Sequence, residues 1–328
     1  MSNRITRRQF VAGLGALAAL SATRAEALGQ KAGAPLYPPA DLSYFRKPIT
    51  PGPSQINLGY AAITWGGDDA QAIKEVAEVG FRGIQLRSNL MREYGDKPKA
   101  LRDLLAAHKL TFTAFSSGGA RIAPGTEAEE VAKHVRHATF VRDAGGLYLQ
   151  VTDSARPKDR KPSAEDFRAL GRVLTEIGKR SIDLGVPLGY HNHMNSLGES
   201  PEEVDRIMEA SDAHYVKLLL DVAHFHQGGG DSAKAIRQYR DRLLFLHIKD
   251  VESPVPGAAG DAAARSYRFV ELGRGRVDLP AVFRALKEIN FRGWAVVELD
   301  SVPDKARTPK ESALISRKYL EEKLGLKV

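Results

Sequence analysis

Short apolar runs that alternate with amphipathic segments constrain the fold of this chain more than any other feature of its sequence. Eight such runs follow one another: Ile56–Thr64, Gly83–Leu86, Thr111–Phe115, Leu147–Val151, Pro187–Tyr190, Val216–Leu220, Leu244–Ile248 and Ala295–Leu299. The intervening segments, such as residues 282–289, space apolar residues by three and four, which places one helical stripe against a sheet. Runs this apolar are typical of parallel strands covered on both faces. Eight strands that alternate with helices predict an α/β fold, the (β/α)8 TIM barrel, with a doubly wound sheet as the alternative.

Capping signals mark the ends of several predicted helices. Residues 200–203 (Ser-Pro-Glu-Glu) and 308–311 (Thr-Pro-Lys-Glu) each offer an N-cap hydroxyl, a proline at the first helical position and a glutamate at the third. Residues 126–129 (Thr-Glu-Ala-Glu) repeat the capping box without the proline. Gly80 and Asn290, which precede the second and eighth runs in similar tetrapeptides, predict left-handed helix caps.

The first residues of the chain carry an export signal. Residues 6–11 (Thr-Arg-Arg-Gln-Phe-Val) form a twin-arginine pattern, an uncharged run rich in alanine and leucine follows, and Ala25-Glu26-Ala27 suits cleavage. The apolar run is too short for the roughly 20 residues that span a membrane. We therefore expect a twin-arginine signal peptide over 1–27, an extended lead-in over 28–55 and one barrel domain over 56–328. The protein would be periplasmic or otherwise exported, without stable membrane insertion.

Composition limits the chemistry that the chain can perform. The absence of cysteine excludes disulfides, thiolate nucleophiles and cysteine-ligated metals, which leaves His, Asp and Glu as metal ligands. The net charge is +8, but the basic residues are scattered rather than arranged in a stripe, so a nucleic-acid surface is not indicated.

Polar residues gather at the C-terminal ends of four consecutive predicted strands, the end of a TIM barrel where active sites lie. The fifth to eighth strands end in His191-Asn192-His193, Asp221, His247-Ile248-Lys249-Asp250 and Glu298-Leu299-Asp300, and His224 and His226 follow the sixth. Taken singly, each residue has a structural alternative, such as a loop cap, a hydrogen-bonded interior histidine or an ion pair. Burying several of these groups at one level without a counter-charge is costly, which favours a bound divalent cation.

These motifs resemble the xylose isomerase-like TIM barrels, which include sugar isomerases, ketose epimerases, inosose dehydratase and an apurinic endonuclease branch. The resemblance spans residues 56–320 and is carried by Gly189–His193, Leu220–His224, Leu246–Asp250, Glu271–Asp278 and the strand of Glu298. It implies metal ligands at the ends of strands five to eight, where Asp221, His247 and Glu298 take the last three positions. His191 stands where epimerases of the group carry glutamate, in a Tyr-His-Asn-His context that is more similar to the dehydratase branch.

The resemblance implies one divalent ion, with Mn, Co, Zn and Mg as alternatives, and a reaction through an enediolate. The cation would act as a Lewis acid while a base removes the proton next to a carbonyl. His193, Lys249 and Glu298 are the candidate acid and base residues. Return of the proton gives isomerisation or epimerisation, whereas loss of a beta substituent gives dehydration or another elimination. The departure at His191 favours elimination on an unphosphorylated sugar, keto-sugar or polyol.

Four residues are candidates for substrate binding. Trp65 follows the first strand, Arg87 the second and His224 the sixth, and Arg276 lies in the long loop after the seventh, which we interpret as a lid. For Trp65 and Arg87 a rim aromatic and a surface charge are the alternatives. The expected partner is a small sugar or polyol, and a partner sugar oxidoreductase that makes the keto group is a hypothesis. A catalytically silent sugar-binding barrel and a metal-dependent endonuclease-like phosphodiesterase are the alternative functions.

Overall fold

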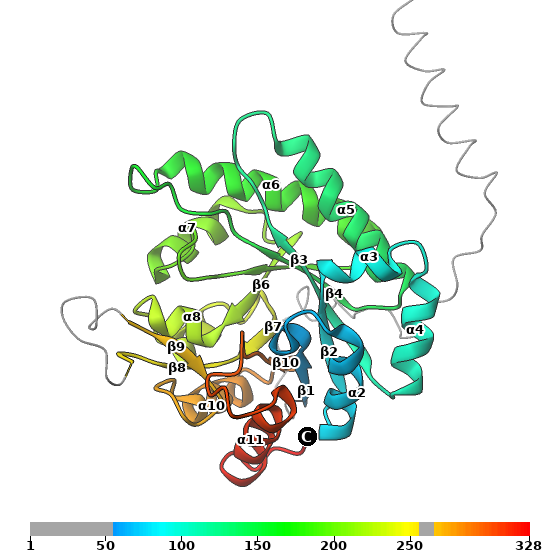
Figure 1. Cartoon of the computed structure of the whole chain (residues 1–328). Helices are drawn as coiled ribbons and strands as arrows, with labels where there is room; N and C mark the ends of the chain where they lie inside the picture. The colour runs from blue at the N-terminus through cyan, green and yellow to red at the C-terminus, as the bar shows by residue number, and fades with distance from the viewer. Residues whose placement is uncertain (1–54, 256–265) are drawn as a thin grey trace, which may run out of the picture. The chain divides into compact units, whose positions relative to one another are not determined.

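Eight parallel strands close into a barrel (Figure 1). The computed structural model describes residues 55–255 and 266–328. In barrel order the strands are β1 (Gln55–Ala61), β10 (Arg292–Val297), β7 (Leu243–Ile248), β6 (Val216–Asp221), β5 (Leu188–His191), β4 (Tyr148–Thr152), β3 (Thr111–Gly119) and β2 (Gly83–Arg87). Each predicted run overlaps one strand, so the TIM barrel is confirmed and the doubly wound sheet is wrong.

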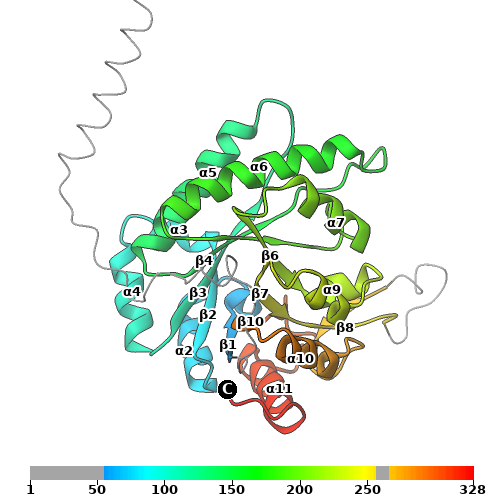
Figure 2. The same cartoon turned by 180° about the vertical axis from the view of Figure 1, so that it is seen from behind.

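The helices lie around the outside of the strands in both views of the molecule (Figures 1 and 2). The longer ones are α2 (Asp69–Val79), α4 (Pro98–Ala107), α5 (Glu127–Asp143), α6 (Ala164–Asp183), α7 (Pro201–Ala210), α10 (Leu279–Glu288) and α11 (Pro309–Glu322). The shorter ones are η2 (Ala62–Trp65), η3 (Ser88–Leu90), α3 (Met91–Tyr94), α8 (Val222–Gln227) and α9 (Ser232–Gln238). Across the part of the chain that the structure describes, no helix combines the length and the apolar character that a membrane span requires.

The capping predictions are confirmed except for one. Ser200 and Thr308 each form a complete capping box with the glutamate three residues on. Gly80 and Asn290 have positive φ angles of 105° and 55°, as expected of left-handed caps. The prediction for Thr126 is wrong, because its hydroxyl donates to the Ala123 carbonyl and makes no cap hydrogen bond.

The barrel interior is packed below the polar strand ends. Tyr148 of β4 and Phe245 of β7 stack with their ring centroids 5.2 Å apart, in a cluster with Ala114 and Val296. His247 lies two residues beyond Phe245 on the same strand, and side chains two apart on a strand share a face. The apolar floor therefore supports a layer of polar side chains directly above it.

The long connection after β7 contains an antiparallel hairpin, β8 (Asp250–Glu252) and β9 (Arg268–Val270). The Asp250 carboxylate accepts hydrogen bonds from the backbone N–H groups of Val251, Gly273, Gly275 and Val277. Glu271 is buried and pairs with Arg307 at 3.0 Å. The described part of this connection is thus anchored to the barrel, which does not favour a freely moving lid.

The predicted signal peptide at 1–27 lies outside the described residues, as does the lead-in at 28–55 except for Gln55, where β1 begins.

Candidate metal centre

Four predicted ligands meet at the C-terminal end of the barrel. His191 ends β5, Asp221 ends β6, His247 lies on β7, and Glu298 follows β10, and these strands are neighbours in the barrel. Each of the four side chains is buried and offers one ligand atom, and these atoms all lie within 4.8 Å of one another. The structure therefore brings together the complete ligand set that the sequence predicted.

Three of the six distances between the ligand atoms match those around a bound cation, and all six are within 4.8 Å. Oδ2 of Asp221 lies 3.6 Å from Nε2 of His191 and 3.5 Å from Nδ1 of His247, which is 3.3 Å from Oε1 of Glu298. Bonds of about 2.0–2.2 Å in a tetrahedral arrangement place neighbouring ligand atoms about 3.3–3.6 Å apart.

Three of these atoms are buried and have no hydrogen-bond partner among the described residues: His191 Nε2, Asp221 Oδ2 and His247 Nδ1. Buried polar atoms almost always have partners, because leaving one unpaired costs about 1–3 kcal/mol. Three such atoms that converge on one point fit a metal ion between them. Two imidazole nitrogens and two carboxylate oxygens suit zinc, cobalt or manganese.

Backbone and side-chain contacts aim Asp221 at this point. Its Oδ1 accepts from the backbone N–H groups of Ala223 and His224 at 2.9 and 2.8 Å, so the carboxylate caps α8 and leaves Oδ2 free. The Asn192 side chain joins the ends of β5 and β6 by pairing with both the N–H and the carbonyl of Asp221.

Sequence reasoning missed two glutamines that hold the histidine ligands. Gln85 on β2 accepts from Nε2 of His247 at 2.9 Å and donates to Oε2 of Glu298 at 3.3 Å. Gln150 on β4 lies 3.0 Å from Nδ1 of His191. The available signal was a polar residue inside an apolar run, which does not by itself reveal its partner.

The charged groups of the cluster perturb one another in the protein without a cation. Burial opposes ionisation of Asp221, but His224 and Lys249 hold its pKa well below the usual range. Burial also lowers the pKa of His191, to about 4. Burial would lower the pKa of His247 as well, yet Glu298 and Asp221 raise it to about 9. The two carboxylates thus keep His247 protonated. A bound metal ion would replace that proton.

Lys249 is buried beside the ligands. Its Nζ lies 2.6 Å from Asp300 Oδ1 and 3.2 Å from Glu298 Oε1, and it sits 4.0 Å from the ring centroid of Phe269 on β9. Burial favours the neutral amine, but Glu298, Asp221 and Asp300 outweigh burial and raise the pKa of Lys249. A lysine held in its charged form can donate to a substrate oxygen but cannot act as a base.

His193 and His224 lie next to the ligand cluster, with ring centroids 3.8 Å apart. Nδ1 of His193 contacts the Met194 carbonyl at 2.7 Å, so it carries the proton and leaves the lone pair on Nε2. His224 is buried, with Nδ1 3.2 Å from the Met194 N–H and Nε2 3.2 Å from Nζ of Lys249. Half-buried His193 is therefore the better placed base.

The other three candidates are less closely tied to the cluster. Trp65 is buried in the hydrophobic core, and its indole donates to Glu75 at 2.6 Å, which occupies its N–H. Arg87 is half-buried at the end of β2, two residues beyond Gln85, and its charge opposes the rise that burial causes in the pKa of Asp69. Arg276 is exposed and donates to the Ser253 carbonyl, so it braces the hairpin connection rather than facing the ligands.

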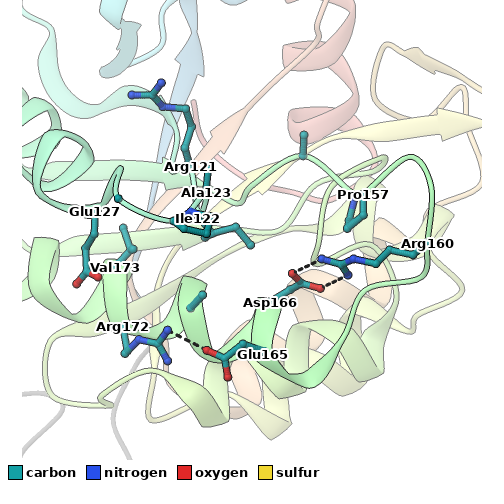
Figure 3. A pocket seen from close by; sticks show the side chains of 14 residues that line it. Arg121, Ile122, Ala123, Glu127, Pro157, Arg160, Glu165, Asp166, Arg172 and Val173 are labelled. Atoms are coloured by element: carbon teal, nitrogen blue, oxygen red, sulfur yellow. Dashed lines mark hydrogen bonds and ion pairs between the residues drawn. The ribbon is translucent and has the colours of Figure 1, made fainter.

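A separate hollow of about 550 Å³ lies between the β3–α5 and β4–α6 connections. Figure 3 shows two of its arginines against carboxylates, Arg160 on Asp166 and Arg172 on Glu165, and the third, Arg121, pairs with Glu130. None of the predicted site residues lines this hollow, and its cations are already paired.

Residues 73–322 match the family model described as xylose isomerase-like TIM barrel. The chain belongs to this family. Among its family relatives, inosose dehydratase of Clostridium perfringens is 28% identical over 302 residues, covering 83% of this chain and 99% of the relative. The rhizopine catabolism protein MocC of Rhizobium meliloti is 30% identical over 277 residues, covering 76% and 83%. A crystal structure of an IolI protein with a bound zinc atom shares the fold, with a TM-score of 0.68 and 21% identity over 81% of this chain and 97% of that one.

Proposed function

We propose that this family member is a metal-dependent lyase or isomerase that removes the proton next to the carbonyl of an unphosphorylated keto-sugar or keto-polyol. The observation that carries the proposal is the convergence of three buried atoms, from His191, Asp221 and His247, that have no hydrogen-bond partner in residues 55–255 and 266–328 and lie beside the Glu298 carboxylate. The zinc atom in the IolI structure, a protein of the same fold, is consistent with a divalent ion here.

The residues around the cluster have different roles in the proposed reaction. A divalent cation, when bound, supplies the Lewis acidity that eases removal of a proton next to a carbonyl. His193 takes the proton on Nε2, and the Lys249 ammonium stabilises the charge that develops on a substrate oxygen. In isomerisation the proton returns to a neighbouring carbon, whereas in elimination the beta C–O bond breaks and the protonated His193 gives its proton to the departing hydroxide, so that water leaves.

Two observations favour elimination on an uncharged substrate. Inosose dehydratase, a relative that aligns over nearly its whole length, is named for the loss of water from a keto-inositol. Lys249, the cation beside the ligands, is already paired with Asp300 and Glu298, which makes it a poor receptor for a phosphate. A keto substrate would in turn require an oxidoreductase that makes the ketone, and we keep that partner as a hypothesis.

The alternatives differ from the proposal in what they need. A nuclease with two or three metals needs further ligand clusters, and the group around His191 is the one candidate that the described residues provide. A silent sugar-binding barrel needs no metal, and it would not explain why buried ligand atoms converge.

The deciding experiment measures the metal content of purified wild type, His247→Ala and Glu298→Ala by plasma mass spectrometry. We expect about one equivalent of divalent metal in wild type and its loss in both variants. The loaded enzyme is then incubated with keto-inositols and 3-keto-glycosides in deuterated water, where alpha-proton exchange reports either reaction and loss of water reports elimination alone. A wild type without bound metal would end the proposal.

We also propose that residues 1–27 direct export through the twin-arginine pathway, that 28–55 form a lead-in and that 56–328 form the barrel domain. Replacing Arg7 and Arg8 by lysine should retain the protein in the cytoplasm, as cell fractionation would reveal. Unchanged export of this double variant would contradict the assignment.

A further inference from the structure

Two buried glutamines each contact one histidine ligand through the ring nitrogen that faces away from the cluster. Gln85 meets Nε2 of His247 at 2.9 Å, and Gln150 meets Nδ1 of His191 at 3.0 Å. A neutral imidazole carries its proton on one nitrogen and a lone pair on the other, and only the lone pair can bind a metal. Whatever fixes the outer nitrogen of each ring therefore decides whether the inner nitrogen can be a ligand.

The amide of Gln85 is already oriented so that His247 can bind a metal through Nδ1. Its Oε1 accepts from His247, which requires a proton on Nε2 and leaves Nδ1, the nitrogen whose proton a metal ion would replace, aimed at the cluster. Its Nε2 donates to Oε2 of Glu298 at 3.3 Å. Because both ends of the amide have a partner, exchanging its oxygen and nitrogen would break two hydrogen bonds at once.

Gln150 stands in the opposite orientation. Its amide nitrogen faces Nδ1 of His191, so this nitrogen accepts and the proton sits on Nε2, where it blocks metal binding. Its Oε1 is buried without a partner among the described residues. Turning the amide by 180° would place this oxygen against Nδ1 of His191, where it accepts from the N–H that the metal-binding tautomer carries on Nδ1. The nearby Thr152 hydroxyl, 3.3 Å from Nδ1, can donate or accept and so permits either state.

We propose that Gln85 and Gln150 are positioning residues that choose the metal-binding nitrogens, Nδ1 of His247 and Nε2 of His191, and that Gln150 turns its amide when His191 becomes a ligand. This inference rests on the proposed metal centre. It gives the two glutamines unequal roles, since Gln85 preorganises its histidine and Gln150 adapts to the loaded state.

Zinc affinity of the full chain, measured by competition with a chelator, tests the two roles. Gln85→Met and Gln150→Met keep the length of the side chain but remove the amide, and each should weaken zinc binding about 10–100-fold, as loss of a ligand-orienting hydrogen bond does. Gln150→Glu offers an acceptor in either orientation and should bind zinc at least as tightly as wild type. Gln55→Glu, exposed at the opposite end of the barrel, adds the same charge away from the site and should change nothing.

Histidine tautomers supply a readout that a purely structural role would not move. Long-range proton–nitrogen NMR spectra of the zinc-loaded wild type should place the proton on Nδ1 of His191 and on Nε2 of His247. In the zinc-free protein the proton of His191 should shift to Nε2, whereas in zinc-free Gln150→Glu it should stay on Nδ1. A charge effect alone would alter affinity without this difference in tautomer.

The outcomes separate this inference from the proposed function. A wild type that binds none of zinc, cobalt and manganese removes both. A wild type that binds zinc, together with glutamine variants of equal affinity or a His191 that binds through Nδ1, removes the roles of the glutamines and leaves the metal centre in place.

Discussion

At the scale of single residues, His247 couples metal binding to pH. The protein without metal holds a proton on this imidazole, because Glu298 and Asp221 overcome the effect of burial and raise its pKa to about 9. His191, with a pKa of about 4, is already neutral above pH 6. Zinc must therefore displace one proton, and its affinity should rise about tenfold per pH unit until about pH 9.

Chelator competition between about pH 6.5 and 9.5 measures this dependence. The same proton has a second consequence. Since the pKa of His247 is raised on folding, its contribution to stability is complete below the unfolded value near 6.5 and disappears as the pH rises through about 9. Unfolding of the zinc-free protein by urea should thus become easier over this interval. A zinc affinity that does not change with pH would mean that His247 is not protonated at the site.

His193 offers the second test at this scale. Removing the base by His193→Ala should lower kcat on the keto substrate by about 10²–10⁴-fold while the bound metal stays at one equivalent. His226→Ala is the matched control, because this half-buried histidine of α8 is not among the ligand or base candidates. Equal turnover in wild type and His193→Ala would exclude His193 as the base.

At the scale of elements, Asp250 anchors the hairpin that carries Phe269 over Lys249. Its two carboxylate oxygens accept from four backbone N–H groups. Asp250→Asn replaces one oxygen by a donor and leaves two buried N–H groups facing it, which should destabilise the fold by about 2–5 kcal/mol. Urea unfolding measures the change.

The control is Asp278→Asn at the N-cap of α10, where asparagine caps as well as aspartate and little change is expected. A cost for Asp250→Asn that is no larger than this control would show that the connection does not depend on the carboxylate.

The same hairpin marks the limit of what the sequence predicts about elements. Periodicity located all eight barrel strands, because each is a largely apolar run flanked by an amphipathic helix. β8 and β9 are three residues each and have no measurable period, and they are held by Asp250, which looked like one more polar strand end. Thr126 resembled a helix cap by spacing alone, but its hydroxyl donates a hydrogen bond to the nearby Ala123 carbonyl instead.

The site was predictable to the same extent as the strands. The four candidate ligands could be located because each stands where an apolar run ends, and parallel strands deliver those ends to one level of the barrel. Gln85 could not be found in this way, since its partner His247 is 162 residues distant and the contact depends on closure of the barrel. Spacing likewise suggested Arg276 as a pocket residue, but its guanidinium donates to a backbone carbonyl.

At the scale of the whole molecule, the proposed centre joins four neighbouring strands whose ligands span residues 191–298. An unfolded chain cannot hold these side chains at one point, so zinc should bind the folded state almost exclusively. Free zinc at about 100 times its Kd should then raise the free energy of unfolding by about 2.7 kcal/mol. Urea titrations with and without zinc measure this difference, and the Glu298→Ala variant, which lacks one ligand, should show a smaller one. Equal stabilisation of both proteins would locate the bound zinc somewhere other than the four strand ends.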